Sequence, residues 1–377
     1  MATIWNYPTR VRFGLGEVEN VGTEVGRLGA TRALVVTDRG VQAAGLCEPV
    51  LASLRQVGIA AQVFAEVDPN PTEANVESGV TALRAHRADL IIGLGGGSPL
   101  DVAKLVAVRN AVSLPFEVLD DSKGGDRFIP AELLPIITIP TTAGTGSEVG
   151  RSGVVTLDST QRKTVIFSPS LMPKVAILDP HLTRSMPPKT TAATGFDAFT
   201  HCLEAWASTG DHPMADGIAR KGIELCVKWL ARAVKDGSDL AARGAMMKAA
   251  MMGAVAFQKG LGACHSLAHP LSSECGLHHG LANALCLPAV VRWNLASAPE
   301  TYADAASLFG LARPEDLPNA IASWRAELGL PAGLEQAGVS ADKLSRLADL
   351  AIEDACHQSN PRACDRAALL ELYRQSL

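Results

Sequence analysis

The fold of this chain is decided by the stretch Leu90-Ile91-Ile92-Gly93-Leu94-Gly95-Gly96-Gly97-Ser98-Pro99-Leu100-Asp101-Val102-Ala103-Lys104. It opens with a short apolar run, which predicts a buried strand, and then passes through three glycines into residues with helical spacing. Glycines let a backbone approach a phosphate closely, and the N-terminus of a helix offers free N–H groups with positive dipole character. A triple glycine after a strand is equally consistent with a plain tight turn.

Strands and helices alternate on both sides of this stretch. Short β-branched runs predict strands at residues 33–37, 60–64 and 134–139, and amphipathic patterns predict helices near residues 50–57 and 73–86. Apolar strands that alternate with helices are typical of a parallel sheet covered on both faces. We therefore expect an α/β dinucleotide-binding domain over residues 1–182.

The pattern changes after about Leu182. The pair Pro187-Pro188 marks a boundary, and stretches rich in Ala, Leu and Met with helical spacing follow it. They predict helices at residues 190–208, 215–234, 240–258 and 318–328. We therefore expect an all-helical domain over residues 183–377.

Composition narrows the class of protein. The 377 residues suit about two domains of roughly 150 residues each. The net charge is −5 and both signs are interspersed, so neither nucleic acid nor an anionic membrane is an expected partner. No apolar run is long enough for a membrane span, and the first residues lack a signal core. The eight cysteines contain no CxxC pair, which favours reduced thiols and a cytoplasmic location.

A second loop supports nucleotide binding. The strand at residues 134–139 runs into Pro140-Thr141-Thr142-Ala143-Gly144-Thr145-Gly146-Ser147-Glu148, where hydroxyl groups and glycines suit phosphate and ribose. Two such loops after parallel strands indicate the ligand crevice of an open α/β sheet. Asp38 follows the first strand, where a carboxylate would accept ribose hydroxyls and favour NAD over NADP. Its alternative role is to cap a helix.

Histidines and an acid in apolar surroundings predict a metal site. Asp197 and His201 are four residues apart in a helical stretch, so they share one face and would be buried. They form either part of a metal site or a salt-bridged core pair. Four further histidines lie downstream among small and apolar residues, namely His265, His269, His278 and His279.

Spacing leaves the metal ligands partly open. It favours His265 and His269 as a helical pair but does not decide which two of the four downstream histidines bind. Three imidazoles and one carboxylate suit a divalent first-row metal such as Fe²⁺ or Zn²⁺. A metal beside a dinucleotide predicts hydride transfer to or from a polarised carbonyl or alkoxide.

With these motifs in place, the sequence resembles the iron-containing (group III) alcohol dehydrogenase family. The resemblance covers most of the chain, and its motifs together are highly specific. They are Gly95-Gly96-Gly97-Ser98 with Asp101 and Lys104, the loop 140–148, the stretch from Asp197 to His201, the stretch from His265 to Pro270, and His279-Gly280.

The resemblance implies an N-terminal dinucleotide-binding domain and a C-terminal helical domain, with the site in the cleft between them. It implies that the metal, iron first and zinc second, is held by Asp197, His201, His265 and His279. His269 would then line the pocket near the nicotinamide, where it is the candidate for relaying a proton. The implied NAD contacts are Asp38, Asn70, Gly96, Gly97, Ser98, Asp101, Thr141, Thr142, Thr145, Lys163 and His269.

Some features are similar to NAD-dependent 4-hydroxybutyrate dehydrogenases of this family. These features are Glu148-Val149-Gly150-Arg151, the stretch from Ala256 to Gly262, Leu277-His278-His279-Gly280, and the stretch from Cys356 to Pro361. Relatives that act on simple alcohols tend to have uncharged residues at Arg151 and Lys259. A buried cation needs an anion, so we expect Arg151 or Lys259 to bind a substrate carboxylate. The alternative is that each pairs with a protein acid, such as Glu148, or reaches solvent.

The expected activity is hydride transfer between NAD(H) and a short-chain primary alcohol or aldehyde, with 4-hydroxybutyrate and succinate semialdehyde as candidates. The alternatives are a general short-chain alcohol dehydrogenase, a reductase of another anionic aldehyde, a lyase resembling dehydroquinate synthase, and a non-catalytic binding protein. The lyase would need a cluster of basic residues that is missing here. The resemblance also implies a homodimer formed through strands near residues 5–13.

Overall fold

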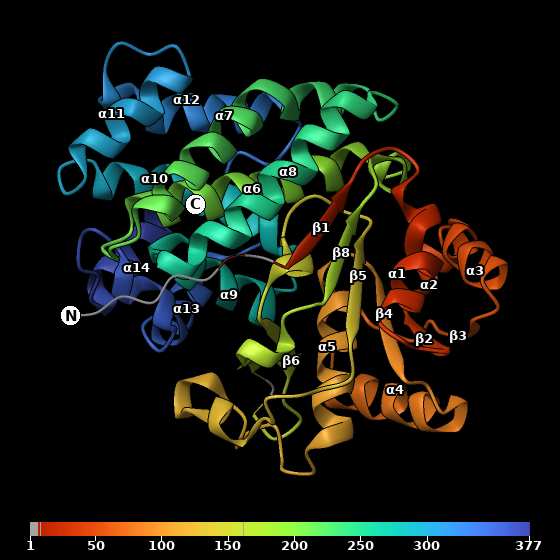
Figure 1. The fold of residues 1–377 in the computed structure, drawn as a ribbon. Coiled ribbons are helices and arrows are strands. Elements are labelled where there is room, and N and C mark those ends of the chain that lie inside the picture. The colour runs from red at the N-terminus through yellow and green to blue at the C-terminus, as the bar shows by residue number, and fades with distance from the viewer. Residues whose placement is uncertain (1–6, 8, 161) are drawn as a thin grey trace. The chain divides into compact units, whose positions relative to one another are not determined.

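The computed structural model describes residues 7, 9–160 and 162–377. The chain forms two compact units, which Figure 1 colours in sequence order. One is an α/β unit, Tyr7–Thr142 with Gly146–Ser185, and the other is a helical unit made chiefly of Met186–Leu377. The predicted fold class, a parallel-sheet domain followed by a helical domain, is confirmed. The division after residue 182 stays a prediction.

The α/β unit is built on a six-stranded sheet in which every described pairing is parallel. The strand order is β1-β8-β5-β4-β2-β3. The strands are β1 (Arg10–Phe13), β2 (Arg32–Val36), β3 (Ala60–Phe64), β4 (Leu90–Gly95), β5 (Ile136–Pro140) and β8 (Val175–Leu178). The glycine turn follows β4, and the second loop follows the neighbouring β5.

Helices cover both faces of this sheet, as its apolar strands predict. They are α1 (Val21–Arg27), α2 (Arg39–Ala43), α3 (Cys47–Gln56), α4 (Glu73–His86) and α5 (Gly97–Ala111). Because strand side chains alternate between faces, Leu34 of β2 packs in a core with residues of α4 and α5. Its neighbour Val35 packs in a second core with residues of α1 and α3.

A small antiparallel hairpin accompanies the main sheet. It consists of β6 (Ser152–Thr156) and β7 (Lys163–Phe167), with Ser152 opposite Phe167. The sequence analysis did not predict it, because its alternating pattern is short and only half-buried. The hairpin positions two predicted site residues, since Arg151 immediately precedes β6 and Lys163 opens β7.

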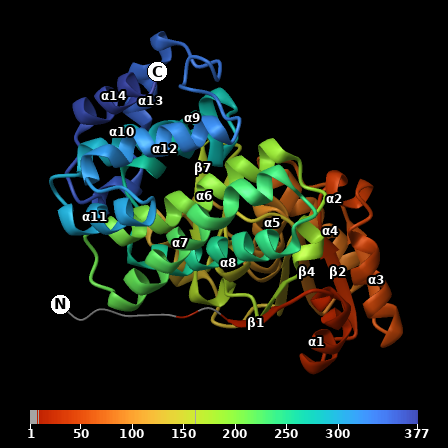
Figure 2. The ribbon, with the colours of Figure 1, turned by 90° about the horizontal axis from the view of Figure 1, so that it is seen from above.

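The helical unit is centred on α6 (Pro188–Ala207). Figure 2 shows it beside α7 (Pro213–Lys235) and α8 (Leu240–Ala256), and it also packs against α10 (His279–Asn294). The other helices are α9 (Ala263–Cys275), α11 (Pro299–Leu308), α12 (Leu317–Glu327), α13 (Leu344–Ala351) and α14 (Arg366–Gln375). A Cβ on Gly253 of α8 would lie 2.8 Å from the Cβ of His201, so a glycine permits this close approach of α8 to α6.

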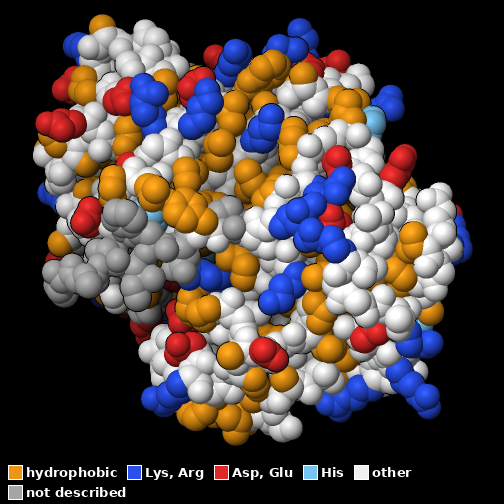
Figure 3. All heavy atoms as spheres, in the orientation of Figure 1, with side chains coloured by type: hydrophobic (Ala, Val, Ile, Leu, Met, Phe, Trp, Pro, Cys, Tyr) orange, Lys and Arg blue, Asp and Glu red, His pale blue; other side chains and the backbone are white. Residues whose placement is uncertain are grey.

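Within the described residues, one segment is long and apolar enough to cross a membrane, Leu240–Lys259. Two thirds of its most apolar window is buried inside the protein, as in the core helix of a soluble domain. The face drawn in Figure 3 carries acidic and basic side chains interspersed among hydrophobic ones.

Candidate metal centre and nucleotide loops

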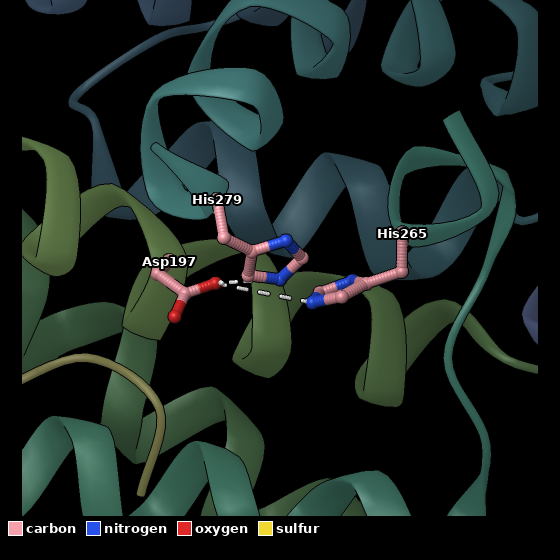
Figure 4. A group of neighbouring side chains, drawn as sticks. All are labelled: Asp197, His265 and His279. Atoms are coloured by element: carbon pink, nitrogen blue, oxygen red, sulfur yellow. Dashed lines mark ion pairs between the residues drawn. The ribbon is translucent and has the colours of Figure 1, made fainter. Parts of the chain in front are cut away.

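Three helices bring the predicted metal ligands together. The pair Asp197 and His201 lies one turn apart on α6, with only 2% and 5% of their surface exposed. His265 lies in the first turn of α9, and His279 is the first residue of α10. In Figure 4 the side chains of Asp197, His265 and His279 point toward one another.

The ligand atoms of Asp197, His265 and His279 all lie within 4.8 Å of one another, as a small divalent metal requires, and His201 borders this group through Asp197. The Nε2 atoms of His201, His265 and His279 lie 3.9, 3.9 and 3.5 Å from Oδ1 of Asp197. A tetrahedral site with bonds of about 2.1 Å separates its ligand atoms by about 3.4 Å. Three imidazoles around one buried carboxylate oxygen therefore match the donor set of a first-row metal centre.

The titrating groups are in the forms that bind metals. Burial, against the attraction of Asp197, lowers the pKa of His201 to about 4 and also depresses the pKa of His279. Burial would raise the pKa of Asp197, but the surrounding imidazoles outweigh it and lower this pKa to about 2. Near neutral pH the cluster therefore offers neutral rings at His201 and His279 and an ionised carboxylate at Asp197, the forms that bind metals.

Glu204 contacts a predicted metal ligand and was missed by the sequence analysis. Its buried Oε2 lies 2.6 Å from Nδ1 of His265, and its Oε1 accepts the backbone N–H of Cys264 at 2.6 Å. This bond fixes the ring of His265 with Nε2 directed at Asp197, as carboxylates do for metal-binding histidines. Its helical spacing was the available signal, since Glu204 lies three residues after His201 on the same buried helix.

His269 stands beside the cluster. Its ring stacks on His279 with centroids 5.2 Å apart, and its Nδ1 lies 2.7 Å from Oδ2 of Asp354. Spacing alone favoured His269 as the partner of His265, but the structure brings His279 next to Asp197 instead. The remaining histidine, His278, is exposed at the N-cap position of α10.

The glycine turn requires its first glycine. Gly95 has φ 150°, and a Cβ there would lie 2.6 Å from the ring of Pro99. The N–H of Thr141 donates to Gly95 O at 2.9 Å, and a Cβ on Gly96 would lie 3.4 Å from Thr142. The two predicted nucleotide loops therefore lie side by side, where α5 begins at Gly97.

Asp38 caps a helix and also borders this turn. Its Oδ1 accepts the N–H of Val41 at 2.8 Å, which is the alternative role that the sequence left open. Its Oδ2 lies 3.5 Å from the Cβ position of Gly95. The cap and a contact with a nucleotide are therefore compatible, because they use different oxygens.

Asp101 and Lys104 form a polar network inside the α/β unit. Asp101 accepts hydrogen bonds from Ser147 Oγ at 2.6 Å and from Val154 N at 3.2 Å. The ammonium group of Lys104 donates to the same Ser147 Oγ and to Ser152 O. These bonds tie α5 to the loop after β5 and to the hairpin, and the predicted contact of Asp101 with NAD stays a prediction.

Four other residues predicted to contact NAD differ in their burial and in their neighbours. Ser98 Oγ donates to Pro69 O at 2.7 Å, which joins the glycine turn to the loop that carries the exposed Asn70. Lys163 on β7 is half-buried and close enough to Asp101 to feel its charge. Thr145 is half-buried and belongs with the helical unit.

The two cations proposed to bind substrate differ in their partners. The side chain of Lys259 is 6% exposed, and its ammonium group lies 2.5 Å from Oδ1 of Asp216 and 2.9 Å from Trp206 O. Lys259 thus pairs with a protein acid, which was the alternative to binding a substrate carboxylate. The half-buried guanidinium of Arg151 lies 5.2 Å from the ring of Phe167, and no ion pair with a carboxylate is found for it among the described residues.

Glu148 is not the partner of Arg151. Its carboxyl group is buried, which raises its pKa to about 7, and the cation that acts on it is Lys104. Burial also lowers the pKa of the Arg151 guanidinium, and no charge from the described residues offsets that effect. Of Arg151 and Lys259, Arg151 is therefore the one for which no carboxylate partner is found among the described residues.

Models of known families match nearly the whole chain. Residues 8–180 match iron-containing alcohol dehydrogenase, and residues 191–377 match the C-terminal part of the Fe-containing alcohol dehydrogenase family. The chain belongs to the iron-containing alcohol dehydrogenase family. The predicted family and class of activity, oxidoreduction of an alcohol or aldehyde, are thereby confirmed.

Members of this family resemble the chain over its full length. It is 39% identical to a 4-hydroxybutyrate dehydrogenase of Cupriavidus necator, with 100% of both chains covered. It is 33% identical to an NAD-dependent methanol dehydrogenase of Bacillus methanolicus, with 97% of each covered. The solved structure of a 1,3-propanediol oxidoreductase superimposes with a TM-score of 0.94 at 35% identity, covering 100% of both chains.

Proposed function

We propose that this iron-containing alcohol dehydrogenase family member is an NAD-linked enzyme that interconverts a short-chain hydroxy acid and its aldehyde. The pair 4-hydroxybutyrate and succinate semialdehyde is our first choice. The observation that carries this proposal is the half-buried Arg151, for which no carboxylate partner is found among the described residues. The 39% identical relative, named for 4-hydroxybutyrate, supports the same choice.

The metal would be held by Asp197, His201, His265 and His279, with Fe²⁺ as the first choice and Zn²⁺ as the second. When bound, such a metal stabilises negative charge on the substrate oxygen. Asp197 contributes the single negative charge of the ligand set, and burial keeps the rings of His201 and His279 neutral. Glu204 keeps His265 oriented from its outer side.

NAD would bind at the two neighbouring loops. Backbone N–H groups at the start of α5 would receive the diphosphate, with the hydroxyls of Thr141 and Thr142 beside it. Asp38 would accept ribose hydroxyls and disfavour a 2′-phosphate, which supports NAD as the cofactor. Contacts from Asn70, Gly96, Gly97, Ser98, Asp101, Thr145 and Lys163 complete the proposed set.

His269 is the proposed proton acceptor. Its Nδ1 is bonded to Asp354, which leaves Nε2 as the nitrogen available for proton exchange. The Asp354 carboxylate stays ionised, because its pKa is held far below the usual range: burial raises it, but His269 outweighs that effect. The dyad thus resembles other histidines whose orientation is fixed by an acid.

We further propose a cytoplasmic homodimer. All eight cysteines are free thiols, which suits a reducing compartment. The predicted dimer strand near residues 5–13 lies partly outside the described residues. Its described part includes β1, an edge strand of the sheet, and edge strands are suited to pairing with a second chain. Light scattering coupled to gel filtration measures the oligomeric state.

The substrate proposal is tested by comparing Arg151→Met with Lys259→Met on two substrates of similar length. We expect Arg151→Met to raise KM for 4-hydroxybutyrate by roughly 10- to 100-fold, the typical effect of losing a hydrogen bond to a charged group. KM for 1-butanol should stay nearly constant, because that substrate has no carboxylate. Lys259→Met should not discriminate between the two.

Equal losses on both substrates in Arg151→Met would contradict the role of Arg151. If the wild-type enzyme prefers a sulfonate- or phosphonate-bearing aldehyde, the proposed anion site stands but the proposed substrate is wrong. A preference for 1-butanol over every anionic substrate would make the protein a general short-chain alcohol dehydrogenase.

A further inference from the structure

We propose that Asn283 is a positioning residue that holds three of the metal ligands at their binding distance. This inference rests on the metal site of the proposed function. Asn283 lies on α10 one turn after His279, and its side chain is fully buried (0% exposed). Neither helical spacing nor the family motifs predicted a role for Asn283.

The side-chain amide of Asn283 faces three ligand atoms at once. Its Nδ2 donates to Oδ1 of Asp197 at 2.9 Å. The same nitrogen lies 3.3 Å from Nε2 of His279 and 3.4 Å from Nε2 of His265. One amide group therefore contacts ligands that come from three different helices, α6, α9 and α10.

The orientation of the amide follows from its neighbours. The amide oxygen of Asn283, Oδ1, lies 3.7 Å from Sγ of Cys264. The same thiol also contacts the backbone oxygen of Asn283. A flipped amide would place an oxygen against the ionised Oδ1 of Asp197, and two acceptors at that distance repel. The nitrogen must therefore face the ligands.

The amide has a physical task at this position. A buried carboxylate needs hydrogen-bond donors, and the lone pairs of Asp197, His265 and His279 repel one another when they converge. Asn283 brings positive N–H hydrogens to the place where these lone pairs meet. It thereby lowers the cost of keeping the ligands of three helices together until a metal takes over these lone pairs, so that less ordering remains to be done when the metal binds.

Asn283 and Glu204 act on different atoms. Glu204 orients His265 through the outer Nδ1, whereas Asn283 acts on the inner Nε2 and on two other ligands. Loss of Asn283 should therefore affect the relative spacing of the ligands, and not only the orientation of one ring.

The test is a measurement of metal affinity that does not depend on turnover. We expect Asn283→Leu, which keeps the branched shape but removes the donor, to weaken Zn²⁺ binding by roughly 10- to 100-fold in competition with a chelator, the range typical of residues that support metal ligands. The absorption spectrum of the Co²⁺-loaded variant should also change, because it reports on ligand geometry.

Asn294→Ala is the matched control. Asn294 is also a buried asparagine on α10, but its side chain exchanges hydrogen bonds with Asn360 and contacts none of the four ligands. Its replacement should lower stability while leaving Zn²⁺ affinity and the Co²⁺ spectrum unchanged. If Asn283→Leu does not fold, Asn283→Ser retains one donor of shorter reach and should show an intermediate loss of affinity.

Two outcomes would overturn the proposal. One is wild-type Zn²⁺ affinity in the folded Asn283 variants. The other is an equal loss of affinity in Asn294→Ala, which would mean that α10 matters only as a packed helix. A wild-type protein that binds neither Fe²⁺ nor Zn²⁺ would instead overturn the proposed metal site itself, so the two failures are distinguishable.

Discussion

The carboxylate of Glu204 holds the ring of His265 at 2.6 Å, while accepting the backbone N–H of Cys264 at the same distance. The N-terminal turn of α9 is thus anchored to α6 by one buried acid. Burial lowers the pKa of His265, but the hydrogen bond from its ring to Glu204 outweighs this, and the pKa is raised. The ring therefore keeps a hydrogen on Nδ1 and directs Nε2 inward.

Glu204→Gln should weaken metal binding. A neutral amide accepts less strongly than a carboxylate, and its N–H₂ group can face His265 and disturb the ring. We expect the rate of metal loss to a chelator to rise by roughly 10- to 100-fold, the typical effect of an outer-shell change. Glu224→Gln, an exposed acid on α7, is the control and should lose metal at the wild-type rate. Equal rates of metal loss in the two variants would show that Glu204 does not support metal binding.

Asp354→Asn should lower kcat without removing the metal. The amide can donate to Nδ1 of His269 and so turn the ring to the wrong tautomer, which weakens proton exchange at Nε2. We expect kcat to fall by roughly 10- to 100-fold, within the usual contribution of a general base. KM for NAD and metal content should stay at wild-type values.

His269→Ala provides the check on Asp354. If both residues act through one ring, the double variant should be no slower than His269→Ala alone. If the loss of kcat in the double variant equals the product of the two single losses, Asp354 acts independently of His269. Asp349→Asn, an exposed acid on α13, should leave kcat unchanged.

Stability should depend on pH through Glu148. Burial raises the folded-state pKa of this carboxyl from 4.5 to about 7, although Lys104 opposes the shift. Because the folded-state pKa is the higher one, the stabilising contribution is complete below pH 4.5 and is lost as the pH rises through 7. The wild-type α/β unit should therefore lose stability between pH 5 and pH 8.

Glu148→Gln should flatten this dependence, since its side chain does not titrate. The measurement is the midpoint of thermal unfolding at several pH values in both proteins. Parallel curves for wild type and variant would show that Glu148 is not the responsible group.

The sequence predicted most of the α/β unit because buried parallel strands are continuous apolar runs. Four strands were predicted in this way. β1 was expected only from the family resemblance, which implies strands near residues 5–13, and β8 was missed because its apolar run is only four residues long. The hairpin of β6 and β7 was missed for a similar reason. Helices with long apolar stretches, such as α6 and α8, were predicted to within a few residues.

The candidate site was harder to predict, because helical spacing describes one helix at a time. It paired Asp197 with His201 but could not show that His279, on another helix, lies nearer to Asp197 than His269 does. Glu204 was missed although it lies three residues after His201 on the same buried helix, and Asn283 was missed because a buried amide has no distinctive pattern. Only their contacts with ligands of other helices reveal their roles.

The residues proposed for metal chemistry and for substrate choice come from separate parts of the chain. Every proposed metal ligand, with Glu204 and Asn283, belongs to the helical unit, whereas Arg151 precedes a short hairpin of the α/β unit. A mutation at Arg151 can therefore change substrate preference without disturbing a metal ligand. Such a division makes new specificities accessible by single substitutions, and it offers a route to engineering this enzyme for other aldehydes.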